Sequence, residues 1–383
     1  MTPQHSTPYW RLSGFYLFYF ASLGALLPYW SPYLRSLGFA ESQIGELVAI
    51  IMATKIVAPN VWGWIADHVG MRMAVVRLAS LLAIVCFAGV FVASDYWWLA
   101  LVMTAFSFFW NASLPQFEAT TMNHLGEQPH RYSSIRLWGS IGFIATVAGL
   151  GALFDAVEIS WLPWVLVALF VGIWVNSLAV PERAAGHLPV DHEPLRRVLV
   201  RKEVAALLAV CFLLQASHGP YYTFYTIYLE DYGYRRSLIG QLWALGVAAE
   251  IGLFVVMHRL LPRLGSRRLL LIALSITTLR WLLIGAFPER LGVLVFAQTL
   301  HAASFGVVHA VAIHLIHRFF TGPHQGKGQA LYSSTSFGAG GAVGSLYAGY
   351  LWSDAGPVAA FAAAALFSAG AFALTWRGLD TRD

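Results

Sequence analysis

The stretch SQIGEL at residues 42–47 recurs 195 residues later as SLIGQL at residues 237–242. Further along, the triplet YSS at residues 132–134 recurs at residues 332–334. A third match, described below, lies between these two and has the same offset as the first. Short matches that recur in the same order indicate a tandem repeat, so the sequence predicts two structurally equivalent halves.

The chain has too few charged residues to form the polar surface of a soluble protein. Of its 383 residues, 58% are hydrophobic and 11% are charged, whereas a soluble domain spends about a quarter of its residues on Asp, Glu, Lys and Arg. A water-soluble enzyme is thereby excluded. The only two cysteines, Cys86 and Cys211, fall in apolar runs, so neither a disulfide nor a cysteine-based metal site is expected.

A window of about 20 residues, the length that crosses a bilayer, divides the chain into twelve apolar runs. They cover residues 10–34, 43–62, 72–93, 97–122, 133–154, 161–180, 204–228, 237–257, 269–287, 291–316, 329–351 and 357–376. The predicted fold is an all-α integral membrane protein with twelve transmembrane helices in two six-helix pseudo-repeats. The N-terminal bundle takes residues 1–181, a hydrophilic cytoplasmic linker residues 182–202, and the C-terminal bundle residues 203–383. Parallel repeats with a site between them are typical of secondary transporters.

The distribution of Lys and Arg predicts the orientation. With the N-terminus inside, 17 of the 24 fall in cytoplasmic segments or at the cytoplasmic ends of spans, four fall outside, and three lie deeper within spans, namely Lys55, Arg136 and Arg280. This imbalance follows the positive-inside rule. Both termini are therefore expected in the cytoplasm.

The loop between the second and third predicted spans has the sequence GWIADHVGMR, residues 63–72, and its Gly70 and Arg72 recur 195 residues later. It resembles the loop signature of the major facilitator superfamily, in which Gly, Asp and Gly alternate with basic residues. The resemblance implies a gating loop formed by Gly63, Asp67, Gly70 and Arg72. Asp67 is placed to cap a helix N-terminus or to pair with Arg72, and breaking that contact would free the halves to rock. The alternative is an ordinary charged turn.

Ionisable groups inside spans cost about 2.5–3.5 kcal/mol each on insertion scales, so they are functional candidates. Glu118 near the end of the fourth span and Arg136 near the start of the fifth are equally far from the centre of the connecting loop. Antiparallel neighbours therefore place both at the same depth. Two interpretations are open. The pair either binds a polar substrate, since both groups form strong charge-assisted hydrogen bonds, or it ties two helices together as a structural ion pair.

The second half carries its own polar groups. Glu250, Arg280, His301 and His309 lie in the eighth to tenth spans, and His301, Phe305 and His309 recur at a spacing that lines one helix face. A lone buried histidine is more often structural, but several ionisable groups in consecutive spans favour a function.

The residues around Glu118 (PQFEA) and after Arg136 (RLWGS) resemble the lactose/proton symporter. The resemblance implies that Glu118 and Arg136 bind substrate and that an aromatic side chain, Trp138 or Phe143, stacks on it.

Arg280 and His301 resemble the arginine and histidine of the symporter's proton machinery. Two departures stand out. Ser304 occupies the position of an expected glutamate, and Glu250 lies about one turn beyond the usual carboxylate. We expect Glu250 to have taken over the protonation role, because Arg280 and a dry surrounding can shift the pKa of a carboxyl group in opposite directions.

The stretches LLQASH, ending at His218, and LGVAAE, ending at Glu250, are similar to the phenylpropionate-permease branch of the superfamily. That likeness extends through both halves and implies an aromatic carboxylate as substrate. His218 and Tyr222, one turn apart in the seventh span, are further candidates for substrate contact.

The sequence thus predicts a secondary-active proton symporter that imports a small organic acid such as phenylpropionate by alternating access. We expect Arg136 to hold the carboxylate with help from Glu118, and a protonation network of Glu250, Arg280, His301 and His309. The expected partners are a small-molecule substrate, a proton and the lipid bilayer. No cofactor, metal or nucleic acid is expected, and the protein is expected to be a monomer in a bacterial inner membrane.

Three other functions stay open. The same site would suit a neutral sugar or a nucleoside. A non-transporting membrane sensor would need an output domain, for which the chain has little room. A membrane-embedded enzyme is disfavoured because no metal-ligand motif such as HExxH occurs.

Overall fold

Every element in the described part of the computed structural model is helical. The structure describes residues 7–126, 128, 131–183, 198, 200–321 and 325–379. The first helices are α1 (Tyr9–Ser36), α2 (Glu41–Val69), α3 (Arg72–Phe87), α4 (Tyr96–Leu125), α5 (Tyr132–Ala156) and α6 (Leu162–Ala179). The later ones are α8 (Lys202–Ser217), α9 (Gly219–Asp231), α10 (Arg236–Leu264), α11 (Ser266–Ala286), α12 (Leu291–Thr299), α13 (Val308–Phe319), α14 (Gln325–Ser333) and α15 (Gly341–Gly378).

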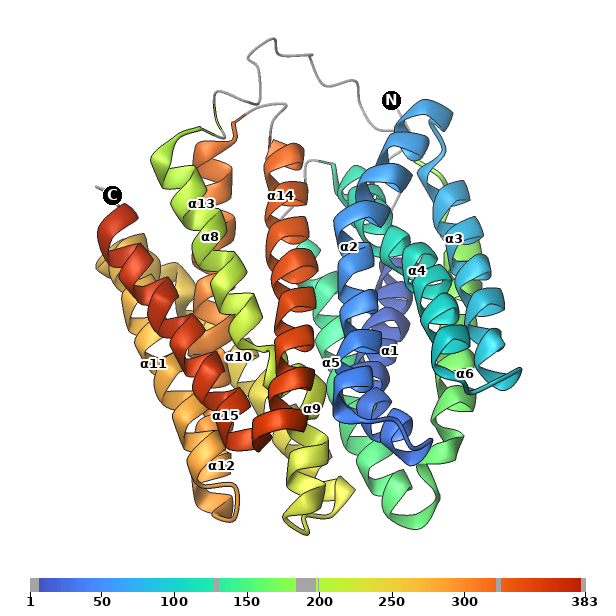
Figure 1. Cartoon of the computed structure of the whole chain (residues 1–383). Coiled ribbons are helices and arrows are strands. Elements are labelled where there is room, and N and C mark those ends of the chain that lie inside the picture. Colours follow the sequence, from blue (N-terminus) through green and yellow to red (C-terminus); the bar gives the residue numbers. More distant parts are fainter. Residues whose placement is uncertain are drawn as a thin grey trace.

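Within these described ranges, eleven stretches are long and apolar enough to cross a membrane. Ten of them overlap one predicted run each, so the prediction of an all-helical, multi-span protein is confirmed. The eleventh, Gln325–Gly378, has 54 residues and contains both remaining runs. Gly356 interrupts it with φ 83° and ψ 174°, and the chain folds back on itself in this part (Figure 1). Only glycine adopts such a backbone readily, so Gly356 encodes the reversal.

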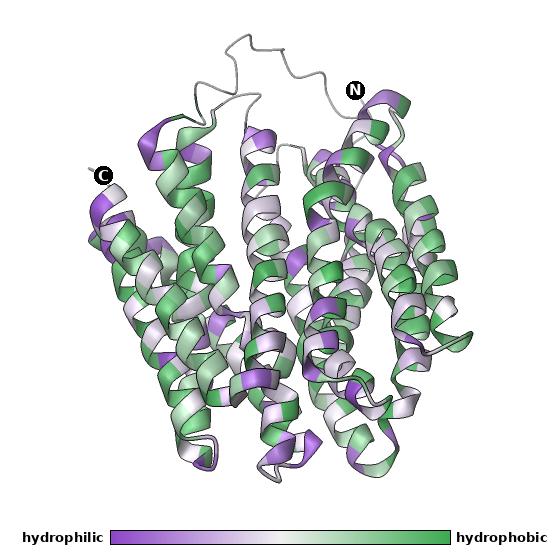
Figure 2. Cartoon of the chain, in the orientation of Figure 1, coloured by the Kyte–Doolittle hydropathy of each residue, from purple (hydrophilic) through white to green (hydrophobic). Residues whose placement is uncertain are grey.

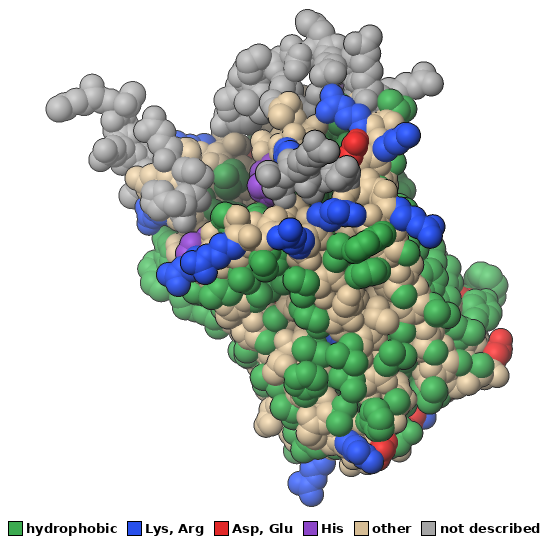
Figure 3. All heavy atoms as spheres, turned by 90° about the vertical axis from the view of Figure 1, so that its left-hand side faces the viewer, with side chains coloured by type: hydrophobic (Ala, Val, Ile, Leu, Met, Phe, Trp, Pro, Cys, Tyr) green, Lys and Arg blue, Asp and Glu red, His purple; other side chains and the backbone are tan. Residues whose placement is uncertain are grey.

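The outer surface is that of a multi-pass integral membrane protein. Hydrophobic residues dominate the bodies of the helices (Figure 2), and hydrophobic side chains cover the middle of the face shown in Figure 3, with Lys and Arg gathered towards its upper edge. Leu279 and Leu282 of α11 and Leu366 of α15 are among the exposed residues. Lipid solvates such a surface, and helices satisfy the backbone polar groups that lipid cannot.

The two ends of the bundle differ. We call the end at which α1 begins and α15 ends the terminal end (Figure 1). The predicted linker, residues 182–202, lies mostly outside the described residues.

At the opposite end, helices α1–α6 are joined to helices α8–α15. Four polar contacts between described residues make this connection: Arg35 to Asp231 at 2.6 Å, Tyr350 to Glu46 at 2.5 Å, Arg236 to the Phe154 carbonyl at 3.5 Å, and the Ser237 N–H to Asp155 at 3.4 Å. All of them lie where α1 and α5 end and α2 and α10 begin, so they tie the helices together on one side of the bundle.

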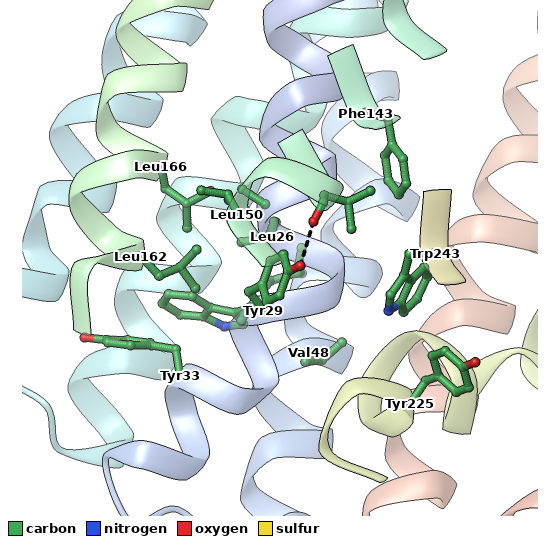
Figure 4. Close-up of a cluster of buried hydrophobic side chains, with 14 of the residues drawn as sticks. Leu26, Tyr29, Tyr33, Val48, Phe143, Leu150, Leu162, Leu166, Tyr225 and Trp243 are labelled. Atoms are coloured by element: carbon green, nitrogen blue, oxygen red, sulfur yellow. Dashed lines mark hydrogen bonds between the residues drawn. The ribbon is translucent and has the colours of Figure 1, made fainter. Parts of the chain in front are cut away.

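Glycines let the same helices approach closely. A Cβ at Gly240 of α10 would lie 2.5 Å from the Val147 carbonyl oxygen of α5, and Gly45 of α2 lies directly against Gly349 of α15. Tyr29 of α1 donates to the Val147 carbonyl at 2.6 Å (Figure 4). Small residues at helix contacts allow this kind of backbone packing. The opposite end is therefore sealed by tight packing as well as by polar contacts.

Replacing Gly240 by valine should open this seal, because the new side chain cannot share space with the Val147 carbonyl. Spin labels at positions 158 and 289, introduced as cysteines in a background without the native cysteines, should show longer distances across the opposite end. Gly292→Val is the control, since a Cβ there meets nothing within 4 Å. Unchanged distances in Gly240→Val would show that the close approach does not hold the seal.

Candidate functional site

Arg136 on α5 is held by aromatic rings of α1. Its guanidinium carbon lies 3.7 Å from the ring centroid of Phe20 and 5.7 Å from that of Tyr16. The side chain is partly exposed, and among the described residues none accepts a hydrogen bond from it. Cation–π contacts position a guanidinium without using its N–H groups. All five donors therefore remain free for a ligand.

Gly139, three residues after Arg136, creates the space for this arrangement. A Cβ at Gly139 would lie 2.6 Å from Nη1 of Arg136 and 2.7 Å from Cδ2 of Phe20. Any larger residue would push the guanidinium off the ring, so the local sequence positions the charge.

Glu118 on α4 lies close enough to Arg136 for an electrostatic interaction, as their equal predicted depth requires. Tyr132 donates a hydrogen bond to its carboxylate at 3.3 Å. Among the ion pairs between described residues, none within 4.0 Å joins Glu118 to Arg136. The structure thus does not support the alternative of a direct structural ion pair, and each group keeps hydrogen-bonding capacity.

Trp138 and Phe143, the two aromatic residues of α5 that were predicted to stack on the substrate, lie on different sides of the helix. Trp138 donates its indole N–H to Tyr9 at 3.0 Å and packs against Trp10, whose side chain is 70% exposed. Trp138 follows Arg136 by two residues, which places it on the other side of the helix, away from the guanidinium. As a stacking residue beside Arg136 it is a wrong prediction for this conformation. Phe143 lies two turns after Arg136 on the same face and near Trp243 of α10 (Figure 4).

A second polar cluster surrounds Arg280 of α11, which is fully buried. Its guanidinium lies over the rings of Tyr221 and Trp281, at 4.3 and 4.6 Å. It donates to the Ala297 carbonyl at 3.0 Å, to Gln298 at 3.2 Å, to Ser304 at 3.0 Å and to Nδ1 of His301 at 3.1 Å. Ser304, which replaces the expected glutamate, thus serves as an acceptor for this cation.

His301 connects Arg280 to Glu250. An arginine can only donate, so Nδ1 of His301 must be the acceptor in this contact. The neutral ring then carries its proton on Nε2, which lies 3.7 Å from Oε2 of Glu250. The structure therefore joins Glu250, His301 and Arg280 in one continuous series of polar contacts.

The side chains of the other two histidines, His309 and His218, differ in how accessible they are to a ligand. His309 on α13 is partly exposed, and its Nδ1 lies 2.9 Å from the Tyr332 hydroxyl. His218 is fully buried, donates from Nδ1 to the Leu214 carbonyl at 2.9 Å, and has no partner at Nε2. In this conformation a ligand does not reach His218, which packs against Tyr222 and Trp281.

Tyr222 is better placed than His218 to contact a ligand. It lines a cavity of about 10 Å³ together with residues of α1 and α2, among them Trp30, Val48 and Met52. Such a volume holds about one water molecule. This cavity therefore places Tyr222 between α1 and α2, from the first part of the chain, with room for no more than a very small ligand group.

Lys55 received no role in the sequence analysis. It lies halfway along α2, one and two turns after Met52 and Val48 on the same helix face. The side chain is partly exposed, and no described residue gives it a hydrogen bond or an ion pair. Its position inside a predicted span was the signal that could have identified it.

The two clusters come from different parts of the chain. Arg136 lies on α5, before residue 182, and Glu250 and His309 lie on α10 and α13, after it. Arg136 is near enough for its charge to act on both, and the side chains of Arg136 and His309 are partly exposed. Within the described residues, no three His, Cys, Asp or Glu side chains are arranged to hold a metal ion.

The predicted gating loop forms the expected contact. Arg72 pairs with Asp67 at 2.5 Å and donates to Gln116 of α4 at 2.6 Å. Gly70 ends α2 with a φ of 72°, which favours glycine. The loop is therefore tied to α4 only two residues before Glu118.

Replacing Arg280 by methionine should destabilise the protein, because four acceptors would lose a buried donor at once. A buried acceptor left without its donor costs about 1–3 kcal/mol, so the Tm in detergent should fall by several degrees. Arg290→Met is the control, since Arg290 is exposed and pairs weakly with Glu289 at 3.8 Å. Equal Tm values for both variants would show that Arg280 contributes no more to stability than an exposed arginine does.

Comparison with known proteins agrees with this geometry. The chain is 32% identical over 353 residues to the "Probable 3-phenylpropionic acid transporter" of Escherichia coli, covering 90% of each chain. It is 28% identical over 345 residues to a maltose permease of Geobacillus stearothermophilus, covering 88% of this chain and 86% of the relative.

Solved structures show the same fold. A mutant of the nucleoside transporter NupG superposes with a TM-score of 0.85 at 15% identity, covering 98% of this chain and 100% of that one. A bacterial homologue of the human lysosomal transporter Spinster, in an inward-facing and unoccupied conformation, gives a TM-score of 0.69 at 14% identity and covers 99% and 98%. The family model described as "MFS_1 like family" matches residues 9–363. The chain therefore belongs to the MFS_1-like family of major facilitator secondary transporters, which are not enzymes.

Proposed function

We propose that this chain imports a small organic acid such as 3-phenylpropionate together with a proton. The observation that carries the proposal is the guanidinium of Arg136, which rests on Phe20 and has no hydrogen-bond acceptor among the described residues. An arginine fork matches a carboxylate with two parallel charge-assisted hydrogen bonds. A substrate carboxylate would supply the acceptors that the protein leaves out.

The charged residues of the two clusters, taken with Lys55, favour an anion over a neutral substrate. Lys55, Arg136 and Arg280 oppose Glu118 and Glu250, which leaves one formal positive charge in excess. At an effective dielectric constant of about 20, opposite unit charges 4 Å apart attract by about 4 kcal/mol. A monoanion would balance this site, whereas a sugar or a nucleoside would leave the excess charge in place.

The relatives support this substrate and also one alternative. A probable 3-phenylpropionic acid transporter is 32% identical to this chain, and a maltose permease is 28% identical. Glu118 has free acceptor capacity that would suit sugar hydroxyls, so a proton-coupled sugar or nucleoside permease is the second candidate. Competition of labelled phenylpropionate binding by a panel of aromatic acids and a panel of sugars and nucleosides separates the two.

The proposed mechanism uses two six-helix bundles, residues 1–181 and 203–383, joined by the linker of residues 182–202. Counting the two arms of Gln325–Gly378 on either side of Gly356 as separate crossings gives twelve spans. An even number of spans places both termini on the same side, and the positive charges at the terminal end favour the cytoplasm. In a bacterial inner membrane this conformation would then be open inwards, and a monomer would suffice.

Binding and conformational change are linked through the facing clusters. The substrate would enter when the opposite end opens and would sit between Arg136 and the residues of α10 and α13. The contact of Arg72 with Asp67 and Gln116 would change as the terminal end closes and the bundles rock. Differential contacts in the two states are what allow a ligand to shift such an equilibrium.

The proton would be taken up by Glu250, with His301 and Arg280 as its neighbours and His309 close to the substrate. An inward proton across 100 mV contributes about 2.3 kcal/mol and offsets the entry of one anionic charge. Protonation of Glu250 would weaken its interaction with Arg136 across the site. Proton release would restore that attraction, which links the carboxyl to the substrate-binding arginine.

Arg136→Gln should weaken phenylpropionate binding by about ten- to a hundredfold, because charge-assisted hydrogen bonds contribute about 1.5–3 kcal/mol. Isothermal titration calorimetry on purified protein measures the change. Arg131→Gln, at the residue just before α5, is the matched control, since the Arg131 side chain donates a hydrogen bond only to Gln128 among the described residues. Equal affinities in the two variants would rule out Arg136 as the carboxylate site.

Glu250→Gln should abolish accumulation driven by a pH gradient and retain exchange of labelled for unlabelled substrate, because exchange needs no net proton movement. Uptake and counterflow in proteoliposomes distinguish the two activities. Glu158→Gln, at an exposed position of the opposite end, is expected to behave as the wild type. Gradient-driven accumulation by Glu250→Gln at the wild-type level would contradict the coupling role.

A further inference from the structure

Two π-helical segments interrupt the helices in the second half of the chain. The segment Ala302–Val307 connects α12 to α13, and Ser334–Gly340 connects α14 to α15. Such segments are rare and frequently occur at functional sites, and the wider turn shifts the side chains that follow out of α-helical register. Each segment carries one phenylalanine, Phe305 or Phe337.

These phenylalanines and His309 form what we call the aromatic wall. The ring centroids of Phe305 and Phe337 are 6.1 Å apart, those of Phe305 and His309 are 5.6 Å apart and nearly parallel, and those of His309 and Phe337 are 6.1 Å apart. All three residues are partly exposed, whereas Tyr332 behind them is buried and fixes His309 by its hydroxyl. The wall is therefore rigid and presents ring surface.

The wall is packed against charged residues from both parts of the chain. A Cβ at Gly306, next to Phe305, would lie 3.2 Å from Cγ of Glu250 on α10, and a Cβ at Gly338, next to Phe337, would lie 3.4 Å from the carbonyl carbon of Lys55 on α2. Arg136 of α5 is near enough for its charge to act on Glu250 and on His309 of the wall. The wall therefore lies where the two parts of the chain meet, beside the charged groups of the site.

Phenylalanine offers no hydrogen-bonding group, so two of the three side chains of the wall recognise surface and shape only. A flat ring placed on such a wall gains stacking and edge-to-face contacts of about 0.5–1.5 kcal/mol beyond simple burial. Polyhydroxylated rings would lose hydrogen bonds to water there without replacement. The wall is thus suited to an aromatic ring.

We infer that the aromatic wall of Phe305, His309 and Phe337 is the ring subsite of the transporter, and that the substrate spans from it to Arg136. The inference rests on the proposed function and adds the position and selectivity of the ring. An aromatic acid of this length contacts both parts of the chain at once. Its binding therefore favours the conformation in which the two parts approach each other.

The test compares 3-phenylpropionate with 3-cyclohexylpropionate, which has the same carboxylate and chain length and no π-system. The wild type should bind the aromatic acid about three- to tenfold more tightly in isothermal titration calorimetry. In Phe305→Leu and in Phe337→Leu this ratio should fall towards one, because leucine keeps apolar volume and removes the ring. Phe296→Leu is the matched control on the same span, since Phe296 is 52% exposed on the outer surface, and it should keep the wild-type ratio.

Phe337→Tyr is the second variant, which retains a ring and should keep the preference, even if one leucine variant fails to fold. A wild type that binds both acids with equal affinity, or leucine variants that keep the wild-type ratio, would overturn the ring subsite and leave the carboxylate site at Arg136 intact. A wild type that binds neither acid would overturn the proposed function itself and the subsite with it.

Discussion

An ionised side chain in the middle of a membrane must find a polar partner, and this constraint governs the architecture described above. Arg280 meets it within the protein, through four acceptors and two aromatic rings. Arg136 does not, because it has aromatic support and no acceptor among the described residues. The two arginines thus differ in role: one stabilises the fold, and the other is left available to a ligand.

The same constraint explains why the sealed end matters. Partly exposed charges in the interior need access to water, and the packing of Gly45 and Gly240 against partner helices closes one route to it. Arg136 and Glu118 are nevertheless partly exposed in this conformation. A transporter that alternates must break one set of contacts as it makes the other, and glycine contacts, which rely on shape rather than on strong bonds, suit that requirement.

Several features could be predicted because they depend on local periodicity or short spacing. The spans follow from apolar runs, and the contact of Asp67 with Arg72 follows from a five-residue separation across a turn. The equal depth of Glu118 and Arg136 follows from the antiparallel hairpin. Their lack of a direct ion pair could not be foreseen, because Tyr132, Phe20 and Gly139 decide where each group points.

Other features depend on tertiary packing and on backbone irregularity. Trp138 is close to Arg136 in sequence, yet helix geometry turns it to the other side and against Trp10. His218 was assigned to the substrate site because it lies one turn before Tyr222 in the sequence. In the structure, packing against Trp281 and Tyr222 buries it. The π-helical segments that orient Phe305 and Phe337 leave no mark in hydrophobic periodicity. Lys55 was visible as an ionisable residue in a span, but nothing in the sequence indicated that it lacks a partner.

The central claim is that the interior holds one excess positive charge, which an anionic substrate would neutralise. It is tested most directly by comparing the binding of 3-phenylpropionate and of its neutral amide to the purified wild-type protein. The two ligands share the ring and the chain length and differ in charge alone. The account predicts that the carboxylate binds at least about tenfold more tightly, since charge-assisted hydrogen bonds contribute about 1.5–3 kcal/mol. Equal affinity for the acid and the amide would contradict it.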